Sequence, residues 1–418
     1  MKKVYFSIFT YDVKIAFPTA FFMYIFMDYG VDATLLSTMY LVNMVLILLL
    51  EYPTGILTDY LGRKRAMILS NVLFAFSYIF VLFVANTIFV IFHFIFTSLA
   101  IALRSGSFPS WLQEFSQSTG NHHREFQKFE LFGLWGRLLG CIGGFLTYYF
   151  TGSYKVSIVV LMMLYCLTTF LFNNLDEHHN ASHLNHFSAD FSNSLAYFRS
   201  DYVKGILLIM NSGSIFLLSL PIYMYYPVNV DLYFEGNRML CVLGVALMFV
   251  AMCLVGLLLT KVTQEFIAKN ESNIHRAAVV SGLLLFLASP MMYYSYRTGH
   301  NLVILVLPVL CSGFYTILRT LSLSTITNII KLDKKEQHMS SIMSMYSALG
   351  MALFCLYYLL INIFTQKDSF DRFIEHYVLI LPIALLSALS VYILSTNHGR
   401  TQKVSKKINP NLDANIIK

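Results

Sequence analysis

The sequence predicts an all-α integral membrane protein with twelve transmembrane helices in two six-helix bundles around a central cavity. Of its 418 residues, 57% are hydrophobic and 12% are charged, and the mean hydropathy is +0.64. A soluble domain carries about 25% charged residues, so this chain cannot cover itself with a polar surface in water. Apolar stretches of about 20 residues, long enough to cross a bilayer as helices, recur along the chain. They are continuous, whereas the strands of a membrane β-barrel alternate in segments of about 10 residues.

Twelve apolar stretches are long enough to be spans. Their expected bounds are 4–27, 34–57, 66–84, 88–110, 126–150, 154–173, 203–226, 238–260, 277–296, 301–328, 339–364 and 376–395. An even number of spans places both termini on the same side of the membrane.

The Lys and Arg residues predict which side that is. With a cytoplasmic N-terminus, 20 of the 29 fall in cytoplasmic segments, five in external loops and four within spans. An excess of Lys and Arg in cytoplasmic loops is the general orientation rule. We therefore expect a multi-pass protein of the cell (inner) membrane with both termini cytoplasmic. The net charge of +7 follows from this topology and does not indicate a nucleic-acid partner.

The longest internal connection follows the sixth span and divides the chain into two halves. Its second part places four apolar side chains at helical spacing, typical of an amphipathic helix on the inner membrane face; they are Phe187, Phe191, Leu195 and Phe198. Two bundles joined in this way are one architecture of secondary transporters. The expected division is 1–173 for the first bundle, 174–202 for the linker, 203–396 for the second bundle and 397–418 for a cytoplasmic tail.

No motif in the chain points to an enzyme, a metal or a cofactor. It contains neither a phosphate-binding G-x-x-x-x-G-K-[ST] nor an H-E-x-x-H metal site. The linker histidines His178, His179, His183 and His186 invite a metal interpretation, but no cysteine accompanies them. All six cysteines fall within spans, where they act as small hydrophobes. The expected partners are a small-molecule substrate, protons and the lipid bilayer, and we expect a monomer.

A charged turn follows the second span, in the stretch EYPTGILTDYLGRKRAM of residues 51–67. It contains Gly55-x-Leu57-x-Asp59-x-x-Gly62-Arg63-Lys64, and this spacing resembles the loop signature G-x-L-x-D-R-x-G-R-R/K of the major facilitator superfamily. Tyr60 stands where the signature has a basic residue. The resemblance implies the twelve-span fold and transport by alternating access.

Flanking residues resemble one bacterial branch of this superfamily, the drug-exporter-like members. The run Glu51-Tyr52-Pro53-Thr54-Gly55 is similar to their E-I-P-T-G segment. Ser105-Gly106 with Glu114 is similar to their S-G…Y-D segment, with Glu in place of Asp. This resemblance implies proton-driven export of drug-like or amphipathic compounds.

The motif predicts a latch between the two bundles, with Gly55, Asp59, Gly62, Arg63, Lys64 and Glu114 as its gating residues. Glycines permit a tight turn and close helix approach, and Asp59 can meet the positive N-terminal end of another helix. The resemblance implies that this helix is the eleventh span, starting near Met339, and Arg63 can pair with Glu114. Alternatively, the basic run serves only to fix topology, which would leave the Gly and Asp spacing unexplained.

Six charged residues fall within predicted spans: Asp12, Lys14, Glu51, Arg104, Arg137 and Arg319. Each costs about 2.5–3.5 kcal/mol at a helix centre, so such residues usually pair or face a cavity. Measured along the helices, they form a layer roughly 9–16 Å from the cytoplasmic ends of their spans. Asp12 and Lys14 are two residues apart and cannot share one helix face.

These charges suggest separate roles in coupling and binding. Asp12 and Glu51 are candidate proton carriers, because a carboxylate removed from water holds a proton more firmly; the alternative is a static ion pair with Arg104 or Arg137. Lys14, Arg104, Arg137 and Arg319 are candidate substrate contacts, since arginine stays charged and either pairs or binds anions. Four basic against two acidic residues favours a substrate with a carboxylate or phosphate group.

The fifth span carries glycines four residues apart, Gly136, Gly140 and Gly144. A stripe of small residues allows close packing of membrane helices. It is also similar to the superfamily's antiporter signature G-P-x-x-G-G, although Cys141 replaces the proline. We expect packing to be its main role.

Two functions fit the sequence best. One is a proton-coupled exporter of drug-like or amphipathic compounds. The other is a dedicated importer or exporter of an anionic or zwitterionic metabolite, siderophore or peptide. A membrane-embedded enzyme or receptor is disfavoured because no catalytic constellation is visible.

Overall fold

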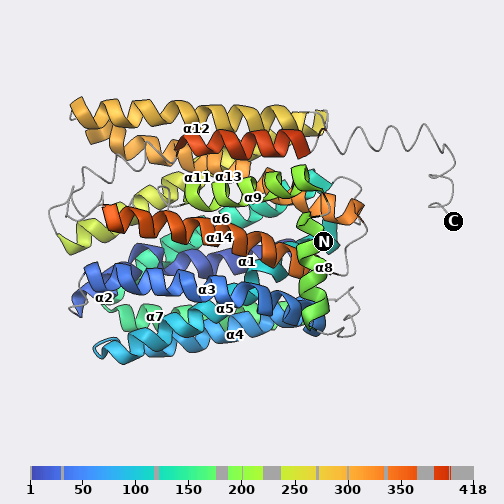
Figure 1. The fold of residues 1–418 in the computed structure, drawn as a ribbon. Helices are drawn as coiled ribbons and strands as arrows, with labels where there is room; N and C mark the ends of the chain where they lie inside the picture. The colour runs from blue at the N-terminus through green and yellow to red at the C-terminus, as the bar shows by residue number, and fades with distance from the viewer. Residues whose placement is uncertain are drawn as a thin grey trace, which may run out of the picture.

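The computed structural model describes residues 2–29, 33–116, 122–175, 187–199, 201–219, 237–269, 273–298, 301–333, 338–364, 381–394 and 396. All regular structure within these ranges is helical. Most helices run roughly side by side along one direction, and α8 (Phe187–Arg199) lies across one end of them, beside the N-terminus (Figure 1). We call this end of the molecule the α8 end.

The helices of the N-terminal half are α1 (Lys2–Ala16), η1 (Phe17–Ala20), α2 (Phe22–Asp28), α3 (Ala33–Leu61), α4 (Arg63–Val81), α5 (Thr87–Ser116), α6 (His122–Thr151) and α7 (Tyr154–Asn173). Those of the C-terminal half are α9 (Tyr202–Ser219), α11 (Arg238–Lys269), α12 (Asn273–Thr298), α13 (Asn301–Leu332), α14 (Met339–Phe364) and η5 (Leu381–Ile383), which leads into a helix over 384–394.

The described helices have the composition and surface of a membrane protein. Nine of them are long and apolar enough to cross a bilayer, and two shorter apolar helices cover Tyr202–Leu218 and Ala384–Leu394. Large apolar side chains face outward, such as Leu49, Phe150 and Leu258, which are 67%, 78% and 64% exposed. An outer surface of this kind suits lipid, so the predicted all-α membrane fold is confirmed at this level. The count of twelve spans stays a prediction.

The first predicted span is not one continuous helix. Residues 4–27 were expected as a single helix, whereas the α-helix stops at Ala16 and a 3₁₀ turn with Pro18 precedes α2. Proline lacks the backbone N–H that would continue the helical hydrogen bonds, which explains the break.

The glycine stripe of α6 packs against α1, as the sequence suggested. A Cβ atom on Gly136, Gly140 or Gly144 would lie within 2.3 Å of a backbone carbonyl oxygen of α1 or η1. Only glycine permits this contact. The stripe thereby sets the register of α1 on α6 and places Asp12 beside the Arg137 turn.

Helix α14 connects the two halves of the chain. It packs against α3 and α5 of the N-terminal half and against α9 of the C-terminal half (Figure 1). On another side of the molecule, α11 and α13 pack against α6. The space enclosed between these two contact zones contains the candidate site.

Helix α8 is fastened to the ends of the C-terminal helices. The Tyr197 hydroxyl donates a hydrogen bond to Asp333 Oδ2 at 2.9 Å, and Lys204 forms an ion pair with the same carboxylate. Tyr197 and Phe198 are buried in a cluster with Ile56 and with residues of α9, α13 and α14. Phe198, one of the four residues of the predicted amphipathic face, therefore packs against the ends of these helices; a position of α8 on the membrane surface stays a prediction.

Candidate functional site

A cavity of about 580 Å³ lies between the two halves of the chain. It is large enough for a small organic molecule, since pockets for such ligands span about 300–1,000 Å³. Aromatic rings from both halves contribute to its wall, including Tyr11, Phe108, Phe216, Phe249 and Tyr315. Six ionisable residues also line it: Asp12, Glu51, Arg104, Glu130, Arg137 and Arg319.

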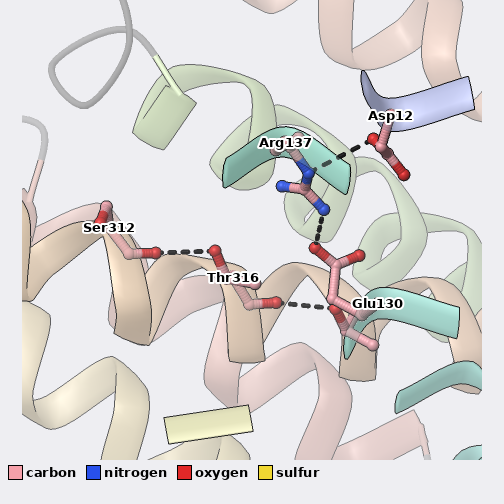
Figure 2. A network of polar contacts seen from close by, with 6 residues as sticks. Asp12, Glu130, Arg137, Ser312 and Thr316 are labelled. Atoms are coloured by element: carbon pink, nitrogen blue, oxygen red, sulfur yellow. Dashed lines mark hydrogen bonds and ion pairs between the residues drawn. The ribbon is translucent and has the colours of Figure 1, made fainter. Parts of the chain in front are cut away.

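Arg137 is shared between two carboxylates on the N-terminal side of the cavity. Its Nε lies 3.3 Å from Asp12 Oδ1 of α1, and its Nη2 forms an ion pair with Glu130 Oε1 of the same helix α6 (Figure 2). Glu130 and Arg137 are seven residues apart, two helical turns, so they share one face of α6. The triad carries two negative charges and one positive charge when fully ionised.

The triad faces α13 of the other half, as Figure 2 shows. On α13, Thr316 Oγ1 donates to the Ser312 carbonyl oxygen at 2.8 Å, and Thr320 Oγ1 donates to that of Thr316 at 2.8 Å. These hydroxyl protons are held within their own helix. At Ser312, Thr316 and Thr320 the three charged residues thus face neutral side chains of α13, whereas Arg319 of the same helix adds a positive charge to the cavity.

Glu51 links the two halves at the edge of the cavity. Its Oε1 accepts a hydrogen bond from Ser347 Oγ of α14 at 2.8 Å, and its Oε2 accepts one from Ser105 Oγ of α5. Its side chain is buried, at 1% exposure. Glu51 is therefore bonded by hydroxyl groups, not by arginine, so the static ion pair considered for it is absent.

Arg104 and Arg319 line the cavity from opposite halves, on α5 and α13. Among the described residues, neither has a carboxylate oxygen within the 4 Å of an ion pair, in contrast to Arg137. Arg104 rests on aromatic faces, with its guanidinium carbon 6.0 Å from the ring centre of Tyr11 and 5.9 Å from that of Phe74. Cation–π contacts at this distance hold an arginine without neutralising it.

Lys14 does not line the cavity, so its expected contact with substrate is not part of this arrangement. It points to the other side of α1, where its amine bonds to Asn71 Oδ1 and lies 4.3 Å from the ring centres of Tyr11 and Tyr165. The reason is the two-residue spacing from Asp12, which turns the two side chains about 200° apart.

The charge balance of the cavity differs from the expected positive surplus. Lys14 leaves the set and Glu130 joins it, so three acidic and three basic residues line the wall. Glu130 was missed because it lies near the start of its predicted span. Its spacing of seven residues from Arg137 was a signal that could have found it.

A contact at the α8 end closes the space between α3, α5 and α14. Asp59 of α3 accepts hydrogen bonds from the backbone N–H groups of Ser340 and Ser341, at 3.2 and 2.9 Å, and from the Ser341 hydroxyl at 2.5 Å. These residues form the first turn of α14, where the helix dipole favours a negative charge. The predicted contact between Asp59 and a helix starting near Met339 is thus present, while a gating role for it stays a proposal.

Two glycines let α14 approach the N-terminal half closely. A Cβ atom on Gly55 would lie 2.6 Å from Ser344 Cβ, and one on Gly106 would lie 2.2 Å from Ser344 Oγ and 2.7 Å from the Ser340 carbonyl oxygen. Ser344 therefore occupies a notch that only glycine on α3 and α5 leaves open. We call the contacts of Gly55, Asp59 and Gly106 with the first turns of α14 the lock.

The other motif residues act within the N-terminal half. Gly62 adopts φ 90° at the start of α4, a conformation that favours glycine. Arg63 donates to the Ser110 carbonyl oxygen of α5 at 3.2 Å, and Lys64 donates to those of Asn173 and Leu175 at the end of α7. These contacts brace the turn between α3 and α4. The Glu114 side chain, expected to pair with Arg63, lies outside the described residues.

No group of three or more His, Cys, Asp or Glu side chains within the described ranges could hold a metal ion. The linker histidines 178, 179, 183 and 186 fall outside those ranges, as do the tail 397–418 and the start of the last predicted span.

The sequence and fold together place the chain among known proteins. The profile of the Major Facilitator Superfamily matches residues 4–355, most of the chain. The chain belongs to the Major Facilitator Superfamily. A comparison with curated proteins finds no match.

Solved superfamily structures share the fold across nearly the whole chain. The transporter FucP in its outward conformation superposes with a TM-score of 0.68 at 12% identity, covering 94% of this chain and 97% of FucP; it is the Escherichia coli fucose:proton symporter. A bacterial homologue of the iron transporter ferroportin, in its outward-facing state, superposes with a TM-score of 0.67 at 12% identity, covering 94% of this chain and 99% of the homologue. The human organic anion transporter MFSD10 superposes with a TM-score of 0.65 at 13% identity, covering 93% of this chain and 98% of MFSD10. At these identities the likeness concerns the fold.

Proposed function

We propose that this superfamily member is a proton-coupled secondary transporter that moves a small organic molecule by alternating access. The observation that carries the proposal is the cavity between the halves of the chain, lined by six ionisable groups and bounded at one end by the lock. Intramembrane ionisable groups that face a cavity are the usual components of substrate and proton pathways. The same halves would move as two six-helix bundles within a twelve-span monomer.

The lock supports a specific step of this cycle. With the basic α8 end on the cytoplasmic side, as the Lys and Arg distribution favours, the arrangement is closed toward the cytoplasm of a cell (inner) membrane. Opening there would separate Asp59 and Ser344 from their partners on the opposite half. Each broken contact is a hydrogen bond or a close packing interaction, so the step needs no buried ion pair to be broken.

Glu51 and Asp12 remain the proposed proton carriers, and Glu130 joins them. Glu51 is the one whose contact crosses between the halves, through Ser347. Because Glu51 also lines the cavity, a proton that reaches the cavity could change this contact directly. Asp12 and Glu130 share Arg137, which leaves one negative charge that a proton can neutralise.

Two substrate classes have separate support. Arg104 and Arg319, which have no carboxylate within ion-pair distance in the described part of the chain, favour an anionic or zwitterionic molecule. The aromatic lining, together with the E-x-P-T-G resemblance to drug-exporter-like members, supports the second candidate, proton-coupled efflux of drug-like or amphipathic compounds.

Flux in proteoliposomes tests the proposal. The full chain is reconstituted, a pH gradient is imposed, and transport is followed for a panel of small organic anions and a panel of cationic dyes. We expect the gradient to drive flux of one panel, and Glu51→Gln to lower that flux roughly tenfold, within the usual range of coupling between two bound ligands. Flux that persists unchanged after a protonophore collapses the gradient would exclude proton coupling.

A further inference from the structure

We infer that Arg104 and Arg319 form one anion-binding site that spans the two halves of the chain, and that an anion bound there brings a proton onto the carboxylates of the same cavity. The inference rests on the proposed transport function and specifies its substrate class and the sense of its coupling. It concerns a carboxylate or phosphate group, the chemistry that arginine recognises through paired N–H donors.

The arginines that line the cavity are of two kinds. Arg137 has both of its carboxylate partners in place, Asp12 and Glu130. Arg104 and Arg319 have no carboxylate within ion-pair distance among the described residues, although both line the same cavity. Arginine stays protonated at physiological pH, so these two charges remain available to a ligand.

Arg104 and Arg319 come from opposite halves of the chain. Arg104 is on α5 and Arg319 is on α13. An anion that contacts both would hold the halves together around itself, which is what a transported ligand must do to bias their relative position. The contacts of Arg104 with the Tyr11 and Phe74 rings restrain its guanidinium group before any ligand arrives.

A bound anion and the carboxylates of the cavity would compete for the same positive charges. Asp12 interacts with the charges of both Arg104 and Arg319, Glu130 with that of Arg319, and Glu51 with that of Arg104. A bound anion takes up these positive charges and adds a negative charge next to the carboxylates. In a cavity shielded from water, like charges disfavour each other's ionised forms. A proton on one carboxylate relieves the repulsion.

The coupling sign follows from this arrangement. Anion and proton stabilise each other, so both would bind in the same state and move in the same direction. Because coupling between two ligands is reciprocal, the proton raises the affinity for the anion by the same factor by which the anion raises the affinity for the proton. Anion binding should therefore be tighter at lower pH. The charged side chains and tyrosine hydroxyls that take part face the cavity from six helices: Tyr11, Asp12, Glu51, Arg104, Glu130, Arg137, Tyr315, Arg319 and Tyr346.

Binding to the purified full chain in detergent tests the site. The probes are hippurate, glutarate and inorganic phosphate, with hippuramide and glutaramide as uncharged controls, and the thermal unfolding midpoint reports binding. We expect at least one anion to raise the midpoint while its amide does not, and its affinity to be roughly tenfold higher at pH 5.5 than at pH 7.5, within the usual range of coupling. Arg104→Gln and Arg319→Gln should each abolish the effect, whereas the matched variant Arg276→Gln, on an exposed position of α12, should keep it.

The carboxylates supply a second, independent readout. Asp12→Asn removes the competing charge, so we expect anion affinity at pH 7.5 to rise and its pH dependence to weaken. When the anion is added to weakly buffered wild-type protein, the protein should take up close to one proton for each anion bound. Proton release, or equal anion affinity in wild type and Arg104→Gln, would overturn the inference, as would the absence of stabilisation by all three anions.

The outcomes separate this inference from the proposed function. Proton-driven flux without an Arg104-dependent anion site would leave the transporter in place and remove the anion site. Coupled anion and proton binding without flux in proteoliposomes would leave the site in place and remove the transporter.

Discussion

The two halves of the chain contribute very different chemistry to one cavity. The N-terminal half supplies five of the six ionisable groups: Asp12, Glu51, Arg104, Glu130 and Arg137. The C-terminal half supplies Arg319 and otherwise neutral hydroxyl groups, from Tyr315, Ser322, Tyr346 and Ser347. The hydroxyl of Tyr346 is itself held at 2.6 Å by Asn211, which bonds to Ser322 and Ser387. A wall with five charged residues therefore faces a hydrogen-bonded wall that is neutral apart from Arg319.

This difference indicates which contacts can change during a transport cycle. Removing one partner of a buried ion pair costs about 3–5 kcal/mol, whereas a single hydrogen bond contributes about 0.5–1.5 kcal/mol, or about 1.5–3 kcal/mol where one partner is charged. The described ion pairs of the cavity lie within the N-terminal half. The contacts between the halves are hydroxyl and backbone hydrogen bonds and close packing. We therefore expect the N-terminal charges to move as a unit while the C-terminal surface exchanges partners.

Removing the shared cation should have the largest effect. Arg137→Ala removes the ion-pair partner that Asp12 and Glu130 share, so we expect a loss of about 3–5 kcal/mol in the free energy of unfolding. Thermal unfolding of the purified protein in detergent measures it. The triple variant Asp12→Asn, Glu130→Gln, Arg137→Gln carries no charge at these positions and should recover most of the loss. An Arg137→Ala variant as stable as the wild type would show that the triad is not a structural unit.

Filling the notch of the lock should have the next largest effect. Gly106→Ala places a methyl group against the Ser344 side chain and the Ser340 carbonyl oxygen, so we expect the closed α8 end to be destabilised by about 1–3 kcal/mol. Labelling of Thr58→Cys, a buried position at this end, by a maleimide reports opening in a background without native cysteines. Gly143→Ala is the matched control, because its Cβ would meet Phe17 only at 3.7 Å. Equal labelling of the two variants would contradict a closed lock.

Neutralising the acid of the lock should have a smaller effect. Asp59→Asn keeps the size and an acceptor oxygen for the Ser341 N–H but loses the charge at the start of α14. The interaction of a carboxylate with a helix N-terminus is worth about 0.3–2 kcal/mol. We expect a moderate rise in Thr58→Cys labelling, smaller than in Gly106→Ala. Labelling at the wild-type level would mean that the charge does not hold the end closed.

The smallest effect is expected for a hydroxyl on the neutral wall. Ser347→Ala removes one hydrogen bond to Glu51, a change of about 1 kcal/mol. We expect a weaker pH dependence of Thr58→Cys labelling with little change in stability. Ser390→Ala removes a hydroxyl that bonds only to the Leu386 carbonyl oxygen and serves as the control. If Ser347→Ala destabilised the protein as much as Arg137→Ala, the contrast between the two walls would be wrong.

Hydropathy and the loop motif were sufficient to predict the fold class, the superfamily and the helix that Asp59 meets. These features depend on local composition and on spacing along one segment. The sequence could not assign each charged residue to the cavity face of its helix, because the rotation of a helix is set by packing. The glycine stripe of α6, for example, sets the rotation of α1. Lys14 turned away from the cavity and Glu130 turned into it for this reason. The partners of Arg137, and the difference between it and Arg104 and Arg319 within the described ranges, could be seen only in the three-dimensional arrangement.

The most direct test of the account follows the pH inside proteoliposomes. The full chain is reconstituted with a trapped pH-sensitive dye, and hippurate, glutarate or phosphate is added outside, with empty liposomes and Arg104→Gln proteoliposomes as controls. The account predicts that an anion acidifies the lumen of wild-type vesicles faster than in both controls, because the anion enters together with a proton. Alkalinisation of the lumen, or a rate equal to that of the Arg104→Gln vesicles for every anion, would contradict it.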